Sequence, residues 1–160
     1  MRAIFLDRDG VINLDKNYLY KIEDFEFAEG VFEALRAFQE MGYTLFVVTN
    51  QSGIGRGYYS EEDFWRLSRW MLERLRDEGI EIKEIFYCPH RPDEGCGCRK
   101  PEPGMILDAA KKYGIDLERS WMIGDKPSDI EAARRAGVGG AILLENKTLF
   151  DTIEIIKESS

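Results

Sequence analysis

Met1-Arg-Ala-Ile-Phe-Leu-Asp-Arg-Asp-Gly10 is the stretch of sequence that decides the fold. Its apolar run, residues 3–6, ends in two acids, Asp7 and Asp9, and a glycine. A short buried strand that delivers polar groups at its carboxyl end is how open α/β sheets build their sites. Residues two apart on a strand share a face, so both carboxylates should point into one crevice.

The spacing of the two acids suggests a metal ion. Two close carboxylates repel each other unless a proton or a divalent cation lies between them. The pair therefore favours a hard ion, Mg²⁺ above all, with one acid left for nucleophilic or acid–base chemistry. An acidic turn that binds no metal would have the same sequence pattern, because Asp and Gly are ordinary turn residues. The rest of the chain decides between the two interpretations.

The overall composition narrows the class of protein. The chain has 160 residues, 44% of them hydrophobic, which suits a single domain over residues 1–160 with a sizeable core. Its net charge of −8 disfavours nucleic acid or an anionic membrane surface as a partner. The sequence has no apolar run of membrane-span length, and its early acid does not fit a signal peptide. We therefore expect a cytoplasmic protein.

The apolar periodicity predicts strands that alternate with helices. Strands are expected at residues 2–6, 44–48, 84–87, 120–123 and 141–144. Helices are expected at 29–40, from a Ser60–Asp63 capping pair to about Glu78, from Pro103, at 128–136 and in the carboxyl-terminal tail, with a glycine-rich loop at 52–59. Repeated strand–helix units indicate an α/β fold, a doubly wound parallel sheet with helices on both faces.

In such a sheet, the loops after the first four strands open onto one edge. These loops carry four pairs of polar residues: Asp7 and Asp9, Thr49 and Asn50, Arg99 and Lys100, Asp125 and Lys126. Each residue alone could be a cap, a surface charge or a turn residue. Together they bring acids, cations and a hydroxyl to one crevice, which indicates an active site.

A second cluster follows the third predicted strand. Cys88-Pro-His90 and Cys96-Gly-Cys98 bring all three cysteines and the only histidine within eleven residues. Three thiolates and an imidazole match a closed structural zinc site with no ligand position left for water. Reduced, unliganded thiols or one redox disulfide are the alternatives.

The motifs resemble those of a known superfamily. Asp7-Arg-Asp-Gly-Val-Ile-Asn13 resembles the first motif of the haloacid dehalogenase (HAD) superfamily of phosphotransferases, and Val48-Thr49-Asn50 resembles the second. Lys100 matches the third motif, and Gly124-Asp125 with Asp129 matches the fourth. Within this superfamily, residues 49–57 and 98–105 resemble the D,D-heptose 1,7-bisphosphate phosphatases, whose nearest relatives are the histidinol-phosphate phosphatases. The intervals 11–28 and 88–102 are too short for the cap domain that many members carry.

The resemblance implies a role for each site residue. Asp7 would attack phosphorus to form an aspartyl-phosphate, and Asp9 would protonate the leaving sugar oxygen and then activate water. Mg²⁺ would be held by Asp7, the backbone carbonyl of Asp9, and Asp125. Thr49 and Lys100 would hold the phosphoryl oxygens, and Asp129 would support the site rather than bind the ion. Contacts with the rest of the substrate are expected from Asn50, Gln51, Ser52, Arg56, Arg99 and Lys126.

The resemblance further implies a magnesium-dependent phosphatase that removes the 7-phosphate of D-glycero-D-manno-heptose 1,7-bisphosphate, in the biosynthesis of nucleotide-activated heptose. We expect a monomer that acts on this small phosphorylated sugar and holds a structural zinc ion. Histidinol phosphate is the alternative substrate, because the five-residue span between His90 and Cys96 resembles the histidinol-phosphatase version. A non-enzymatic phospho-aspartate switch is a remote alternative, since it would need an acid where the chain has Tyr87-Cys88.

Overall fold

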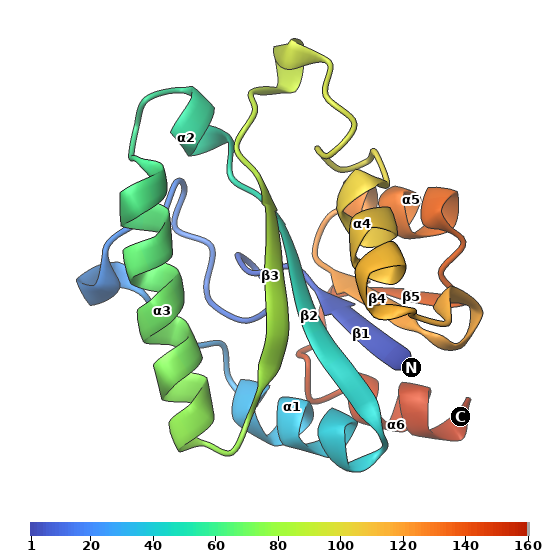
Figure 1. Ribbon diagram of the computed structural model, residues 1–160. Coiled ribbons are helices and arrows are strands. Elements are labelled where there is room, and N and C mark those ends of the chain that lie inside the picture. Colours follow the sequence, from blue (N-terminus) through green and yellow to red (C-terminus); the bar gives the residue numbers. More distant parts are fainter. Residues whose placement is uncertain (160) are drawn as a thin grey trace.

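The computed structural model describes residues 1–159 and has a five-stranded parallel sheet at its centre (Figure 1). The strands are β1 (Arg2–Leu6), β2 (Tyr43–Asn50), β3 (Ile82–Cys88), β4 (Trp121–Gly124) and β5 (Gly140–Leu143). They lie in the order β3-β2-β1-β4-β5, and every neighbouring pair is parallel. The predicted doubly wound fold is confirmed, with each strand within two residues of its expected bounds.

Helices cover both faces of this sheet. The longer ones are α1 (Val31–Glu40), α3 (Glu61–Asp77), α4 (Gly104–Tyr113), α5 (Pro127–Ala136) and α6 (Thr152–Glu158). Figure 1 shows α3 and the pair α4 and α5 on opposite sides of the strands. None of the helices in the described part of the chain is long and apolar enough to cross a lipid bilayer.

Two cores follow from the alternation of side chains along β1. Ile4 and Leu6 pack in one buried cluster with residues of α1, α3 and α6, whereas Ala3 and Phe5 pack in a second with residues of α4 and α5. All four side chains are fully buried, as expected for a central strand of a parallel sheet. The two cores hold β1 rigidly, so its carboxyl end is a firm base for Asp7.

The connections contain short helical turns. The 3₁₀ turns are η1 (Ile22–Asp24), η2 (Pro92–Glu94) and η3 (Leu117–Arg119). The glycine-rich loop expected at 52–59 is partly wrong, because its first half forms the short helix α2 (Ser52–Gly55). The packing explains the difference: the Tyr59 ring lies where a Cβ of Gly53 would be, so this turn is folded back onto its own end. As expected, residues 11–28 and 88–102 form loops and short turns, and the described chain has no cap domain.

Candidate active site

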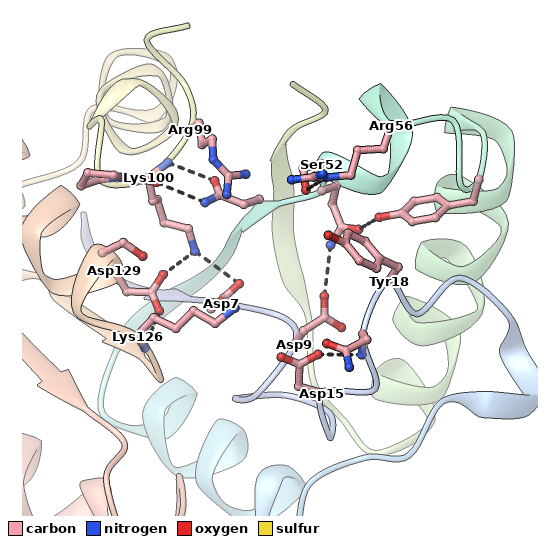
Figure 2. A pocket seen from close by; sticks show the side chains of 16 residues that line it. Asp7, Asp9, Asp15, Tyr18, Ser52, Arg56, Arg99, Lys100, Lys126 and Asp129 are labelled. Atoms are coloured by element: carbon pink, nitrogen blue, oxygen red, sulfur yellow. Dashed lines mark hydrogen bonds and ion pairs between the residues drawn. The ribbon is translucent and has the colours of Figure 1, made fainter. Parts of the chain in front are cut away.

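The loops at the carboxyl edge of the sheet enclose a cavity of about 440 Å³ (Figure 2). Its lining contains most of the residues expected from the sequence: Asp7, Asp9, Asn50, Gln51, Ser52, Arg56, Arg99, Lys100, Lys126 and Asp129. It also contains residues that the sequence analysis missed: Asp15, Asn17, Tyr18, Tyr59, Pro101 and Ser128. Most of the missed residues lie in loops without a motif of their own, whereas Pro101 falls within the motif of residues 98–105 and Ser128 in the first turn of α5. The expected Thr49 and Asp125 are not part of the lining; Thr49 is buried.

The base of the cavity holds a buried cation between two carboxylates. Lys100 Nζ lies 2.6 Å from Asp129 Oδ1 and 3.3 Å from Asp7 Oδ1, and it donates to the carbonyl of Val48 at 2.9 Å. Burial raises the pKa of Asp7 to about 7, although Lys100 acts in the opposite direction, and the neighbouring acids add to the rise. Burial alone would lower the pKa of Lys100, but Asp7 and Asp129 outweigh it and the net shift is upward.

Asp125 completes a group of three acids. Carboxylate oxygens of Asp7, Asp125 and Asp129 all lie within 4.8 Å of one another. Asp125 Oδ1 is buried and has no hydrogen-bond partner in residues 1–159, and burial together with Asp129 raises the pKa of Asp125. Gly10, with φ +89°, makes this approach possible because a Cβ at that position would overlap the Asp125 carboxylate. Three acids, two of which share one lysine, with one oxygen unsatisfied, are suited to hold a divalent cation.

Asp129 holds the start of α5 as well as the lysine. Its Oδ2 accepts hydrogen bonds from the backbone N–H groups of Asp125 and Lys126, each at 3.1 Å, and its Oδ1 contacts Lys100. Both oxygens are therefore engaged by protein donors. The supporting role expected for Asp129 stays a prediction.

Asp9 is held by donors on several sides. The guanidinium of Arg8, only 1% exposed, contacts both carboxylate oxygens of Asp9 at 3.0 Å, and the side-chain amide of Asn13 donates to it at 3.0 Å. Arg8 also donates to the carbonyl of Leu19 at 3.1 Å. No role was expected for Arg8 from the sequence, because an arginine inside a motif gives no sign that it will be buried.

Two expected substrate contacts, Asn50 and Gln51, are bonded to protein groups. The side chain of Asn50 accepts from the backbone N–H of Lys100 at 3.0 Å and donates to its carbonyl at 3.3 Å. Gln51 Nε2 donates to Thr49 Oγ1 at 2.9 Å and to Asp9 Oδ2 at 3.3 Å, while Tyr59 donates to Gln51 Oε1. Both side chains lie at the cavity as expected, but each is engaged in holding a neighbour.

Among the cationic residues on the cavity wall, Arg56 and Lys126 are exposed to solvent. Arg56 is exposed; its Nε lies 3.5 Å from Ser52 Oγ and its guanidinium stacks over Tyr18 at 5.9 Å. Figure 2 shows Arg56 and Arg99 on different loops at the same cavity. With Lys126 and Lys100 they give the lining four cations, which balance its four acids, Asp7, Asp9, Asp15 and Asp129, although the whole chain carries a charge of −8.

The four expected zinc ligands are brought together in the loop after β3. His90 Nδ1 lies 3.4 Å from Cys88 Sγ and 3.3 Å from Cys98 Sγ, and Cys96 Sγ lies 3.5 Å and 3.7 Å from the same two sulfurs. Cys88 and Cys98 are themselves in bonding contact as a disulfide, and Cys96 is a free thiol. The cluster therefore has the composition of a zinc site, in a form in which two of its sulfurs are joined to each other.

Comparisons with known proteins agree with this architecture. A family model described as HAD-hydrolase-like matches residues 97–156. The D-glycero-alpha-D-manno-heptose-1,7-bisphosphate 7-phosphatase of Campylobacter jejuni is 51% identical over 91% of this chain and 84% of its own length. The D-glycero-beta-D-manno-heptose-1,7-bisphosphate 7-phosphatase of Vibrio cholerae is 52% identical over 89% of this chain and 80% of its own length. A crystal structure of the D,D-heptose 1,7-bisphosphate phosphatase from B. bronchiseptica, complexed with magnesium and phosphate, matches with a TM-score of 0.89 and 31% identity, and the match covers 100% of both chains.

The parallel sheet and the acidic edge with its buried lysine define the class, the phosphatases of the HAD hydrolase superfamily. With half of its residues identical over nine-tenths of its length, the chain belongs within that class to the family of the D-glycero-D-manno-heptose-1,7-bisphosphate 7-phosphatases. The resemblance noted from the motifs is thereby confirmed. Relatives named for the α and the β anomer match almost equally well.

Proposed function

We propose that this protein hydrolyses the 7-phosphate of D-glycero-D-manno-heptose 1,7-bisphosphate through an aspartyl-phosphate on Asp7. The observation that carries the proposal is the buried Asp7–Lys100–Asp129 arrangement at the base of a cavity that Arg56, Arg99 and Lys126 also line, with Asp9 beside it. The names of its relatives supply the substrate, because residues at the cavity alone define only a phosphorylated ligand.

Asp7 is arranged to act as the nucleophile. The backbone N–H of Arg8, at 2.8 Å, and Lys100 both contact Asp7 Oδ1, which leaves Oδ2 to attack phosphorus. As the new O–P bond forms, the bond from phosphorus to the sugar oxygen breaks, and Asp9 gives a proton to that oxygen. In the second step Asp9 takes a proton from water, the water oxygen attacks phosphorus, and the carboxylate of Asp7 is released with inorganic phosphate. Thr49 and Lys100 would hold the phosphoryl oxygens throughout.

The acids fit a magnesium ion. Asp7, Asp125 and the backbone carbonyl of Asp9 would hold it, and the unpartnered Oδ1 of Asp125 supports this set. When bound, Mg²⁺ would neutralise charge between the attacking carboxylate and the phosphoryl group. Asp129, whose two oxygens already bind protein donors, would keep Lys100 in place.

The remaining cavity residues suit a substrate with a second phosphate. Arg56, Arg99 and Lys126 would contact it, and Ser52 would contact the sugar. Arginine presents a planar fork of donors that matches phosphate oxygens. The monomeric state and the cytoplasmic location expected from the sequence stay predictions.

We also propose that Cys88, His90, Cys96 and Cys98 bind a structural zinc ion. Tetrahedral zinc, with Zn–S bonds of about 2.3 Å and Zn–N bonds of about 2.0 Å, keeps its ligand atoms about 3.5–3.8 Å apart. The spacings of His90 and Cys96 from the other two ligands, 3.3–3.7 Å, support such a site. Zinc requires the disulfide pair to be reduced. Metal analysis together with a thiol titration decides between the two forms, because an oxidised loop would hold no zinc and titrate as one thiol.

The test of function is phosphate release with Mg²⁺ from D-glycero-D-manno-heptose 1,7-bisphosphate and from histidinol phosphate in parallel, with Asp7→Asn as the blank. We expect strong preference for the heptose and no release in the blank. Preference for histidinol phosphate would leave the mechanism in place and replace the substrate. Release from neither compound would contradict the proposal and favour the phospho-aspartate switch.

A further inference from the structure

Gln51 links two residues that act at different atoms of the substrate. Its side chain is 2% exposed, and its Nε2 lies 2.9 Å from Thr49 Oγ1 and 3.3 Å from Asp9 Oδ2. An amide nitrogen carries two hydrogens, so each contact can receive one. The amide therefore joins the hydroxyl that would hold the phosphoryl group to the acid that would transfer the proton.

The chemistry of the partners fixes the direction of these hydrogen bonds. The Tyr59 hydroxyl donates to the carbonyl oxygen of Gln51, so the NH₂ group of Gln51 is turned toward Thr49 and toward Asp9 Oδ2, which accepts from it. Thr49 Oγ1 then accepts from the same NH₂ group, and its own hydroxyl hydrogen, which makes a long contact of 3.5 Å with the Asn50 carbonyl, can turn to a phosphoryl oxygen. With the amide reversed, Asp9 would face a carbonyl oxygen and Thr49 would have to donate its hydrogen to Gln51.

Tyr59 holds the amide in this orientation. Its hydroxyl donates to Gln51 Oε1, and burial raises the pKa of Tyr59 to about 12, so the hydroxyl keeps its proton. The Tyr59 ring stacks on Tyr20, with ring centroids 5.4 Å apart and planes 14° apart. On another side the ring occupies the space beside Gly53, where a Cβ would overlap it. The ring is therefore confined, and the donor to Oε1 stays fixed.

We propose that Gln51 is a positioning residue, oriented by Tyr59, that keeps the Thr49 hydroxyl a donor to the phosphoryl group and holds Asp9 toward the leaving oxygen. This inference rests on the proposed function. It assigns to Gln51 a role other than the direct substrate contact expected from the sequence, and it gives Tyr59, outside every motif, a part in catalysis.

The test uses two esters that differ in their need for a proton. The heptose ester leaves as an alkoxide and needs the acid, whereas p-nitrophenyl phosphate releases a phenolate that is stable without one. Tyr59→Phe removes only the hydroxyl that orients Gln51. We expect kcat to fall for both esters, because Thr49 is affected, and to fall about tenfold further for the heptose ester, a part of what a general acid contributes.

Tyr20→Phe is the matched control, because it alters the same ring stack without touching Gln51, and it should leave the ratio of the two kcat values unchanged. Gln51→Glu keeps the shape of the side chain but replaces both amide donors. It should therefore lower the ratio of kcat for the heptose ester to kcat for p-nitrophenyl phosphate more than Tyr59→Phe does. If Tyr59→Phe does not fold, the ratio in Gln51→Glu is the test of the inference. An unchanged ratio in the folded variants, including an equal loss on both esters, overturns the inference. A wild-type enzyme inactive on both esters overturns the proposed function and this inference with it.

Discussion

Lys100 is the residue on which the charge balance of the site depends. It lies between Asp7 and Asp129, is 4% exposed, and is the ion-pair partner that the structure gives to each of them. Removing one member of a buried ion pair leaves a charge without compensation, which costs more than the pair itself contributes. The carboxylates would then repel each other across a few ångströms.

Lys100→Met should therefore abolish turnover and lower the free energy of unfolding by about 3–5 kcal/mol, measured by denaturant titration without metal. Adding Asp7→Asn to this variant should restore part of the stability but none of the activity, because it removes one of the two uncompensated charges. Stability equal to that of the wild type in Lys100→Met alone would show that the lysine does not compensate these acids.

At the scale of elements, the loop between β3 and α4 would position the cations proposed to act in catalysis. It runs from Cys88 through the cysteine cluster to Arg99 and Lys100, and Asn50 at the end of β2 clamps the backbone of Lys100. A loop of this kind has little buried apolar surface, so a metal ion would supply most of its order.

Cys96→Ser tests this link between metal and catalysis. We expect it to lower zinc content, melting temperature and kcat together, because the loop that carries Lys100 would lose its anchor. Unchanged melting temperature and zinc content would contradict the zinc proposal. The variant also discriminates between the two forms of the loop, since the Cys88–Cys98 disulfide does not use Cys96.

The N-terminal cap of helix α3 offers a contrasting case, because it is expected to affect stability and not activity. Ser60 accepts from the backbone N–H of Asp63 at 3.0 Å, and Asp63 accepts from the backbone N–H of Ser60 at 3.0 Å, which confirms the predicted capping pair. Ser60→Ala should cost about 1 kcal/mol and lower the melting temperature by about 2–4 °C. We expect kcat to stay within experimental error of the wild type. Glu62→Ala, an exposed change in the same turn, should have a smaller effect, and an equal effect would argue against the cap.

The elements also explain how much of the site the sequence could predict. Asp7, Asn50 and Lys100 were found because parallel strands end at a common edge, so position along a strand or in the loop after it fixes their place. The contacts of Arg8 with Asp9 and of Tyr59 with Gln51 could not be found in this way. They depend on how loops fold over the sheet, and no short-range pattern encodes that packing.

For the whole molecule, the three acids make stability depend on pH and on metal together. A carboxyl whose pKa is higher in the folded protein than in the unfolded chain keeps its proton longer when folded. For Asp7 the two values are about 7 and 3.8, and Asp125 is shifted in the same direction. In metal-free protein these groups should therefore lower the free energy of unfolding as the pH rises from about 4 to about 7, with little further change from Asp7 above that range.

Magnesium should reverse this loss, because it binds the ionised carboxylates and competes with their protons. We expect the rise in melting temperature between EDTA and excess Mg²⁺ to be small near about pH 5 and large near about pH 8. Asp7→Asn should flatten the metal-free curve and remove most of the magnesium effect, since its side chain stays neutral at every pH. A magnesium effect independent of pH, or one that survives in Asp7→Asn, would place the ion away from Asp7 and contradict the ligand set proposed for it.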